Sequence, residues 1–158
     1  ENRFIATERN LLLRAGLSTH YYDGQGNAYV EWLVTGYTEN SEGFADDSYR
    51  SVNTLFILQR IRWEQRKHFS QNFQGYNLAA DGGKTPANEL IMTPSLFKSE
   101  LLSLYRNFVD RGWVQDYEGY KETLVTELDP DNQDRINFVD QPVLVRGWRI
   151  TAGQSQFK

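Results

Sequence analysis

Apolar residues at helical spacing predict two long helices in the middle of the chain. The first covers residues 51–69, with Ser51 at the N-cap and a broad apolar face that we expect to be well buried in its first half. That face consists of Val52, Leu55, Phe56, Leu58 and Ile61. The second begins at Thr93 and Pro94, a good N-cap and a good first helical residue, and Gly112 ends it. Its apolar residues are Phe97, Leu101, Leu104, Tyr105 and Phe108.

A short helix and a hairpin are predicted before the long helices. The short helix covers residues 8–15, with Thr7 as N-cap and Gly16 as the C-terminal stop. Residues 17–22 and 28–37 alternate between polar and apolar and flank a Gly-rich turn, which predicts a β-hairpin. One face of the second strand is apolar, and we expect that face to meet the core. Its members are Ala28, Val30, Trp32 and Val34.

Three further extended runs follow the second long helix. Residues 120–128 and 135–139 alternate, and the Asp, Asn and Pro residues between them are typical of a turn. The third run covers residues 143–150, directly after Pro142. The order of helices and strands predicts an α+β fold, with helices packed on a mixed β-sheet.

The end of the chain, residues 151–158, is extended in pattern but too polar to bury itself. Such a segment can pair its backbone with the edge of a sheet, including a sheet on another molecule. We therefore divide the chain into a domain over residues 1–142 and a C-terminal strand and arm over residues 143–158. The chain opens on Glu rather than Met, so we expect it to be part of a longer polypeptide.

The composition fits one packed domain and argues against several functions. The chain has 158 residues, of which 39% are hydrophobic and 14% aromatic, enough for one core. A net charge of −4 gives no electrostatic case for general nucleic-acid binding. The absence of cysteine removes disulfides, thiolate metal sites and cysteine nucleophiles. No apolar run approaches the ~20 residues that span a bilayer, and no signal peptide is visible.

Two motifs resemble ligand sites but lack a required glycine. The Gly-Lys-Thr sequence at residues 83–85 resembles the end of a phosphate-binding loop, yet Leu78 stands where that loop needs Gly. Asp129 opens a pattern that resembles a calcium loop, yet Asp134 stands where Gly is required. A plain glycine-rich loop and a hairpin turn are the favoured interpretations of the two segments.

Candidates for catalysis are few. His20 lies in an alternating strand pattern, His68 ends a basic helical stretch, and neither has a nucleophile at recognisable spacing. We therefore predict no catalytic, cofactor-binding or metal-binding residues, and no enzyme activity. A hydrolase with an unrecognised site is the third-ranked hypothesis.

Basic residues gather in the second half of the first long helix. They are Arg60, Arg62, Arg66 and Lys67. One interpretation is a solvated face whose charges complement the helix dipole. The other is a docking face for an acidic partner.

Several short sequences occur along the chain in a characteristic order and spacing. They are ERNLLL at 8–13, GLST at 16–19, VEWLVTGY at 30–37, DSY at 47–49, VNTL at 52–55, LAADG at 78–82, TP at 93–94, EL at 100–101, RG at 111–112 and DRI at 134–136. In these residues the chain resembles the C-terminal part of the contractile tail sheath protein of Mu-like bacteriophages, and more distantly the sheaths of contractile bacteriocins. It departs from that family at residues 140–148, where the family has a double proline and an asparagine.

The resemblance implies a structural subunit rather than an enzyme. It implies a tube-proximal sheath domain in a helical homo-oligomer around the tail tube, located in the virion and assembled in the host cytoplasm. The implied partners are other sheath subunits, the tail tube protein, the baseplate and the tail terminator, with no cofactor, membrane or direct nucleic-acid contact. Rigid-body rearrangement of subunits would drive the tube through the host envelope for genome ejection.

The resemblance also implies where subunits meet, because terminal arms in such sheaths add strands to the sheets of adjacent subunits. The predicted interface residues of the arm are Val143, Leu144, Val145, Arg146, Trp148, Arg149, Ile150 and Phe157. The four basic residues become a candidate tube contact, with the helix after Thr93, which carries Lys98 and Arg106, as an alternative. The competing hypothesis is a soluble binding module whose basic helix contacts an acidic protein or a nucleic acid.

Overall fold

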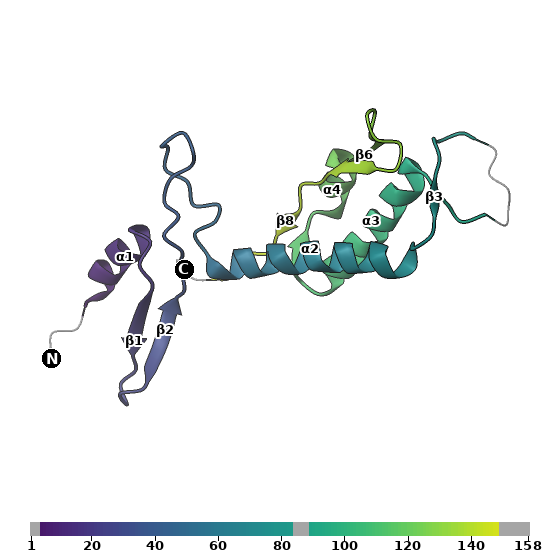
Figure 1. Cartoon of the computed structure of the whole chain (residues 1–158). Helices are drawn as coiled ribbons and strands as arrows, with labels where there is room; N and C mark the ends of the chain where they lie inside the picture. Colours follow the sequence, from purple (N-terminus) through teal and green to yellow (C-terminus); the bar gives the residue numbers. More distant parts are fainter. Residues whose placement is uncertain (1–3, 84–88, 149–158) are drawn as a thin grey trace, which may run out of the picture. The chain divides into compact units, whose positions relative to one another are not determined.

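The computed structural model describes residues 4–83 and 89–148 (Figure 1). The chain divides into two compact units, Glu1–Glu64 and Gln65–Lys158, and the division falls inside the helix α2, Val52–Asn72. The sequence analysis placed a boundary after residue 142 instead. That boundary stays a prediction. No helix within the described ranges is both long and apolar enough to cross a membrane.

The first unit opens with the helix α1, Ala6–Arg14. Its N-cap is Ile5, whose backbone N–H donates to Glu8 Oε2 at 2.8 Å. The predicted cap at Thr7 is therefore wrong, because the Glu8 carboxylate caps the helix two residues earlier. The predicted stop is confirmed: Gly16 has a φ of +79°, a value that glycine adopts without strain.

The predicted hairpin is confirmed as β1, Thr19–Tyr22, and β2, Ala28–Trp32, which pair antiparallel. Asp23 organises the turn, because its Oδ1 accepts hydrogen bonds from the backbone N–H groups of Gln25 and Asn27 at 2.9 and 2.8 Å. The hairpin is shorter than predicted, since β2 ends at Trp32 and Val34 forms only an isolated bridge with Ser51.

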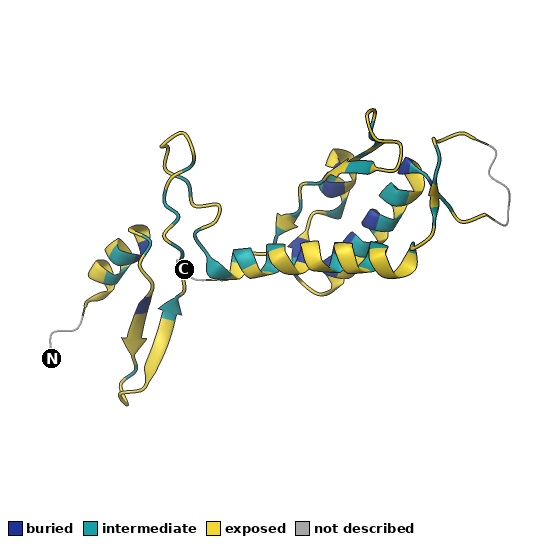
Figure 2. Ribbon diagram, viewed as in Figure 1, coloured by how far each residue is buried: buried dark blue, intermediate teal, exposed yellow. Residues whose placement is uncertain are grey.

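One face of this hairpin is open in the described chain (Figure 2). Val30 is 63% exposed and Ala28 is exposed, so the expectation that this face meets the core is wrong there, while Val34 is buried. The reason is that α1 lies against the opposite face. There Glu31 Oε2 accepts from Arg9 Nε and from Thr19 Oγ1, each at 2.8 Å.

The apolar face predicted for α2 is largely not buried. Ile61 is 3% exposed, but Phe56 is 63% exposed and the other predicted members are half-buried. Phe56 and Leu58 are two positions apart and so project from opposite sides of a helix with 3.6 residues per turn. A set of side chains that winds around the helix in this way cannot all meet one packing surface.

The loop between β2 and α2 is ordered around Asp46. Its Oδ1 accepts from the Ser48 backbone N–H at 2.8 Å and from Ser48 Oγ at 2.6 Å, and its Oδ2 accepts from Tyr37 Oη at 2.6 Å. The Ser48 hydroxyl, then the Tyr37 hydroxyl, lower the pKa of Asp46 from 3.8 to about 2 because they bond its charged form.

Asp46 should therefore titrate near pH 2 in the folded chain. A carboxylate with a lowered pKa stabilises the fold above its ordinary pKa, and we expect this contribution to fade as the pH falls from 3.8 through about 2. Ser48→Ala should move the Asp46 midpoint back toward its ordinary value in an NMR titration of the side-chain carboxyls. Ser41→Ala, an exposed change in the same loop, is the control; an ordinary Asp46 midpoint in the unmutated chain would contradict the assignment.

The described part of the second unit contains two more helices and three short strand pairs. The helices are α3, Pro94–Asp110, and α4, Tyr117–Thr123. The parallel pair is β3, Asn77–Leu78, with β4, Ile91–Met92; the antiparallel pairs are β5, Val114–Gln115, with β8, Val143–Leu144, and β6, Val125–Leu128, with β7, Ile136–Val139. The described strands thus form separate two-stranded ladders, so the predicted mixed sheet is wrong, while the α+β class holds.

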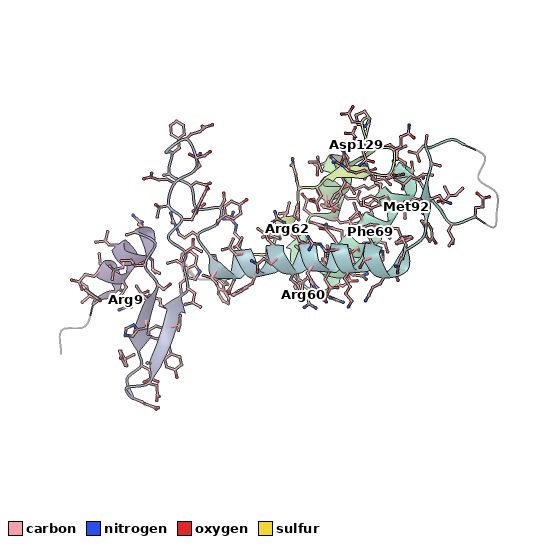
Figure 3. All side chains as sticks on the ribbon, viewed as in Figure 1. Arg9, Arg60, Arg62, Phe69, Met92 and Asp129 are labelled. Atoms are coloured by element: carbon pink, nitrogen blue, oxygen red, sulfur yellow. The ribbon has the colours of Figure 1, made fainter. Side chains whose placement is uncertain are left out.

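The core of this unit is built by α3 and its neighbours (Figure 2). Thr93 caps α3 as predicted, since its Oγ1 accepts from the Leu96 backbone N–H at 3.3 Å and Pro94 occupies the first turn. The fully buried side chains are Leu101, Tyr105, Phe108, Val114, Tyr120 and Leu124. Phe69 from α2, labelled in Figure 3, stacks on Phe97 of α3 with ring centroids 4.2 Å apart, which joins the end of α2 to this core.

Residues 120–123 are helical rather than extended, which corrects the strand predicted over 120–128. Asp116 caps α4, with its side chain accepting from the Gly119 backbone N–H at 3.1 Å. The predicted inward residues Tyr120, Leu124 and Leu128 are spaced by four, a spacing that fits both an alternating strand and one face of a helix. The strand starts only at Val125, while the turn at Asp129 and the strand β7 are confirmed.

Candidate functional site

The predicted interface residues of the arm begin inside the second unit. Val143 and Leu144 form β8, and one edge of β8 pairs with β5. The Val145 backbone N–H also donates to Trp113 O at 3.0 Å. The strand predicted over 143–150 is therefore shorter in its described part, where it is two residues long. These contacts lie within the second unit, and the predicted interface with another molecule stays a prediction.

Beyond β8 the side chains turn outward. Arg146 is exposed and Trp148 is 85% exposed, the largest exposed fraction among the described large apolar residues. Arg149, Ile150 and Phe157 lie outside the described residues. A tryptophan so exposed next to a strand end is a suitable anchor for a partner, because buried aromatics dominate the energetics of protein interfaces.

A buried polar cluster holds the start of this segment. Asp140 Oδ2 accepts from Gln65 Nε2 at 2.8 Å and from Tyr120 Oη at 3.2 Å. Tyr105 Oη donates to Gln115 O at 2.7 Å and accepts from the Val143 backbone N–H at 3.3 Å. The rings of Tyr105 and Tyr120 stack with centroids 3.6 Å apart.

Burial and the nearby Asp140 charge raise the pKa of Tyr120 far above its ordinary value, and burial likewise raises the pKa of Tyr105. Both hydroxyls therefore stay protonated and act as donors at neutral pH. The sequence patterns missed this cluster. One signal was available: Gln65 lies one turn after the buried Ile61 and one turn before Phe69, a polar residue on a buried stripe.

The basic residues of α2 fall into two pairs. Arg60 is engaged, with its guanidinium 2.8 Å from Glu64 Oε1 and 4.5 Å from the Trp63 ring centroid. Arg62 is two positions from Arg60 and so projects from the other side of the helix (Figure 3). By the same helical spacing, Arg66 follows Arg62 one turn later. Both are exposed, and so is Lys67. Arg62 and Arg66 are therefore the members of the set best placed to meet an acidic partner.

The alternative helix is less available. Lys98 Nζ donates to Leu124 O at 2.7 Å, and the Arg106 guanidinium lies 4.7 Å from the Tyr117 ring centroid. Both cations thus serve contacts within the second unit, which favours α2 over α3 as the basic docking helix.

Of the two motifs that lack a required glycine, the one at Asp129 forms the favoured hairpin turn, while Lys84 and Thr85 of the other lie outside the described residues. Asp129 Oδ1 accepts from the backbone N–H groups of Asp131 and Asn132, and its Oδ2 accepts from Asn137 and pairs with Arg135 at 2.9 Å. Those bonds belong to a hairpin turn. Within the described ranges, no three His, Asp or Glu side chains come together as a metal site would require.

Comparison with solved structures first gives the fold. A solved structure of the sheath tail protein from Desulfitobacterium hafniense superposes with a TM-score of 0.57 at 16% identity, covering 90% of this chain and 33% of that one. The fold is therefore that of a sheath protein.

The sequence then gives the family. The Mu-like prophage FluMu tail sheath protein of Haemophilus influenzae is 35% identical over 156 residues, which is 99% of this chain and 32% of that protein. Residues 45–158 match the phage tail sheath C-terminal domain. The chain belongs to the phage tail sheath family, as its short sequences predicted, and it spans 32% of the length of this curated relative.

Proposed function

We propose that this chain is part of a structural subunit of a contractile phage tail sheath. The observation that carries the proposal is the 35% identity to a Mu-like prophage tail sheath protein across 99% of the chain. The subunit polymerises with other sheath subunits around the tail tube, meets the baseplate and the tail terminator at the ends, and is assembled in the host cytoplasm into the virion. It acts as a structural protein and not as an enzyme.

In this proposal the C-terminal arm connects neighbouring subunits. Residues after Val145 add to the sheet of an adjacent copy through backbone hydrogen bonds, which tolerate rotation between subunits when flexible links flank the strand. Gly147 is one candidate link, since a Cβ there would meet nothing within 4 Å. Contacts between copies that do not close on themselves generate a helix. Contraction is then a rigid-body rearrangement of connected subunits that drives the tube through the host envelope.

Electron microscopy of the full-length protein is the direct test. We expect tubular polymers with a helical repeat, in the presence of tail tubes or alone. Full-length protein that stays monomeric with tubes present would count against the proposal. Salt-sensitive binding to DNA would instead favour a nucleic-acid-binding module.

Charge reversal on α2 tests the tube contact. In this proposal Arg62 and Arg66 of the basic set face an acidic tube, because Arg60 projects from the other side of α2 and pairs with Glu64. Exposed ion pairs are worth only about 0.2–1 kcal/mol each, so a repeated weak contact can guide assembly and still release on contraction. Arg62→Glu with Arg66→Glu should reduce tube-dependent assembly severalfold, measured by cosedimentation with tubes.

The matched control changes the same charge elsewhere. Arg14→Glu with Lys121→Glu alters two exposed cations on α1 and α4 and should leave tube-dependent assembly intact. Equal loss in both double variants would indicate a general effect of net charge. Unchanged assembly in the α2 variant would remove α2 from the tube contact.

A further inference from the structure

The segment from Asp140 to Val145 is fastened to the second unit at two points. At the first, the Asp140 carboxylate accepts from Gln65 of α2 and Tyr120 of α4, at 2.8 and 3.2 Å. At the second, the Val143 backbone N–H donates to Tyr105 Oη of α3 at 3.3 Å, within the β5–β8 ladder. Three helices therefore hold one short stretch of chain, in addition to its backbone pairing.

We infer that Gln65, Tyr105, Tyr120 and Asp140 form a clamp that fixes the point at which the C-terminal arm leaves the domain. The role of the arm itself rests on the proposed function. The clamp is made by described residues of one unit, so its existence can be tested separately from sheath assembly.

Three of the four clamp residues are buried. Tyr105 and Tyr120 are each 1% exposed and Gln65 is 8% exposed, while Asp140 is half-buried, so the loss of one partner leaves a largely buried polar group unpaired. A hydrogen bond to a charged group is stronger than one between neutral groups. The two bonds that the Asp140 carboxylate accepts are of this stronger kind. The stacked tyrosine rings hold both hydroxyls in place.

The clamp also explains how so short a strand can anchor an arm. The β5–β8 ladder contains two residue pairs, and a ladder of that length opens easily when pulled from one end. With the clamp, a pull on the arm reaches α2, α3 and α4 at once. Arg146, Gly147 and Trp148 follow directly and lie outside the ladder.

Tyr105→Phe and Tyr120→Phe test the clamp, because each removes one hydroxyl and keeps the ring. We expect amide hydrogen exchange at Val143 and Val145 to become roughly 3- to 10-fold faster, with the amides of Leu101 and Phe108 unchanged. Tyr117→Phe is the matched control. Its ring lies 6.4 Å from that of Tyr105, and it takes no part in the four hydrogen bonds of the cluster.

The pattern across amides separates the clamp from general stability. Equal acceleration at Val143 and at Leu101 would show that the tyrosines only stabilise the core, and no acceleration in either variant would overturn the clamp. Asp140→Asn keeps an acceptor oxygen and should accelerate exchange less than Asp140→Ala. Exchange that is the same in both Asp140 variants would contradict the role given to the carboxylate.

Assembly of the full-length protein supplies the second readout. If the arm connects subunits, Tyr105→Phe should lower the yield of tubular polymer severalfold and Tyr117→Phe should not. If exchange at Val143 changes in the tyrosine variants but arm-deleted protein assembles normally, the clamp is supported and the arm is refuted as a connector. Failed assembly of arm-deleted protein with unchanged exchange in the tyrosine variants would refute the clamp alone.

Discussion

Tubular polymers should disappear when residues 149–158 are deleted from the full-length sheath protein, while the domain stays folded. The reason is that the arm supplies the connection between subunits in the proposed function. The deletion removes no contact among the described residues, because β8 and the clamp lie before it. Polymers are scored by electron microscopy, and folding by thermal unfolding of the same preparations.

Two companion variants make this result specific. Replacing residues 149–158 by a Gly/Ser segment of the same length should fail in the same way, since the proposed function requires this segment to pair as a strand and a flexible linker of equal length does not. Deleting residues 143–158 should also weaken the domain, because β5 loses its partner and Tyr105 loses the Val143 N–H. Sheaths of normal length from the 149–158 deletion would refute the connecting arm.

Features with a local chemical cause could be predicted from the sequence. The start of α3 at Thr93 and the turns at Asp23 and Asp129 depend on side chains that bond neighbouring backbone groups, so a few adjacent residues suffice to identify them. Family membership could be predicted as well, because it depends on the order of many short sequences. The strand predicted over residues 120–128 was wrong at its start, because a spacing of four residues does not distinguish a helix from a strand.

Features that depend on distant contacts could not be predicted in the same way. The apolar face of β2 has the pattern of a core strand, yet Val30 is 63% exposed in the described chain. Periodicity states which side chains share a face and leaves open what covers that face. The clamp joins Gln65 to Asp140 across 75 positions, and no local pattern reports such a pair. Gln65 was only visible as a polar residue on an apolar stripe.

Leu101→Ala should lower the free energy of unfolding by about 2–5 kcal/mol, the range for truncating a buried leucine. Leu101 is 1% exposed and belongs to the face of α3 that also carries Tyr105 and Phe108. The substitution leaves a cavity where those side chains meet. Urea unfolding followed by far-UV circular dichroism gives the change, with the slope of the transition as a check that unfolding stays cooperative.

Phe56→Ala is the informative contrast, because the sequence pattern and the structure disagree about this residue. The pattern puts Phe56 on a buried face of α2, whereas the structure leaves it 63% exposed, so truncation should change the unfolding free energy by less than about 0.5 kcal/mol. A cost comparable to that of Leu101→Ala would mean that the predicted apolar face of α2 is packed after all. A small effect on the isolated chain together with reduced polymer yield would instead show that Phe56 is covered only in the assembled sheath.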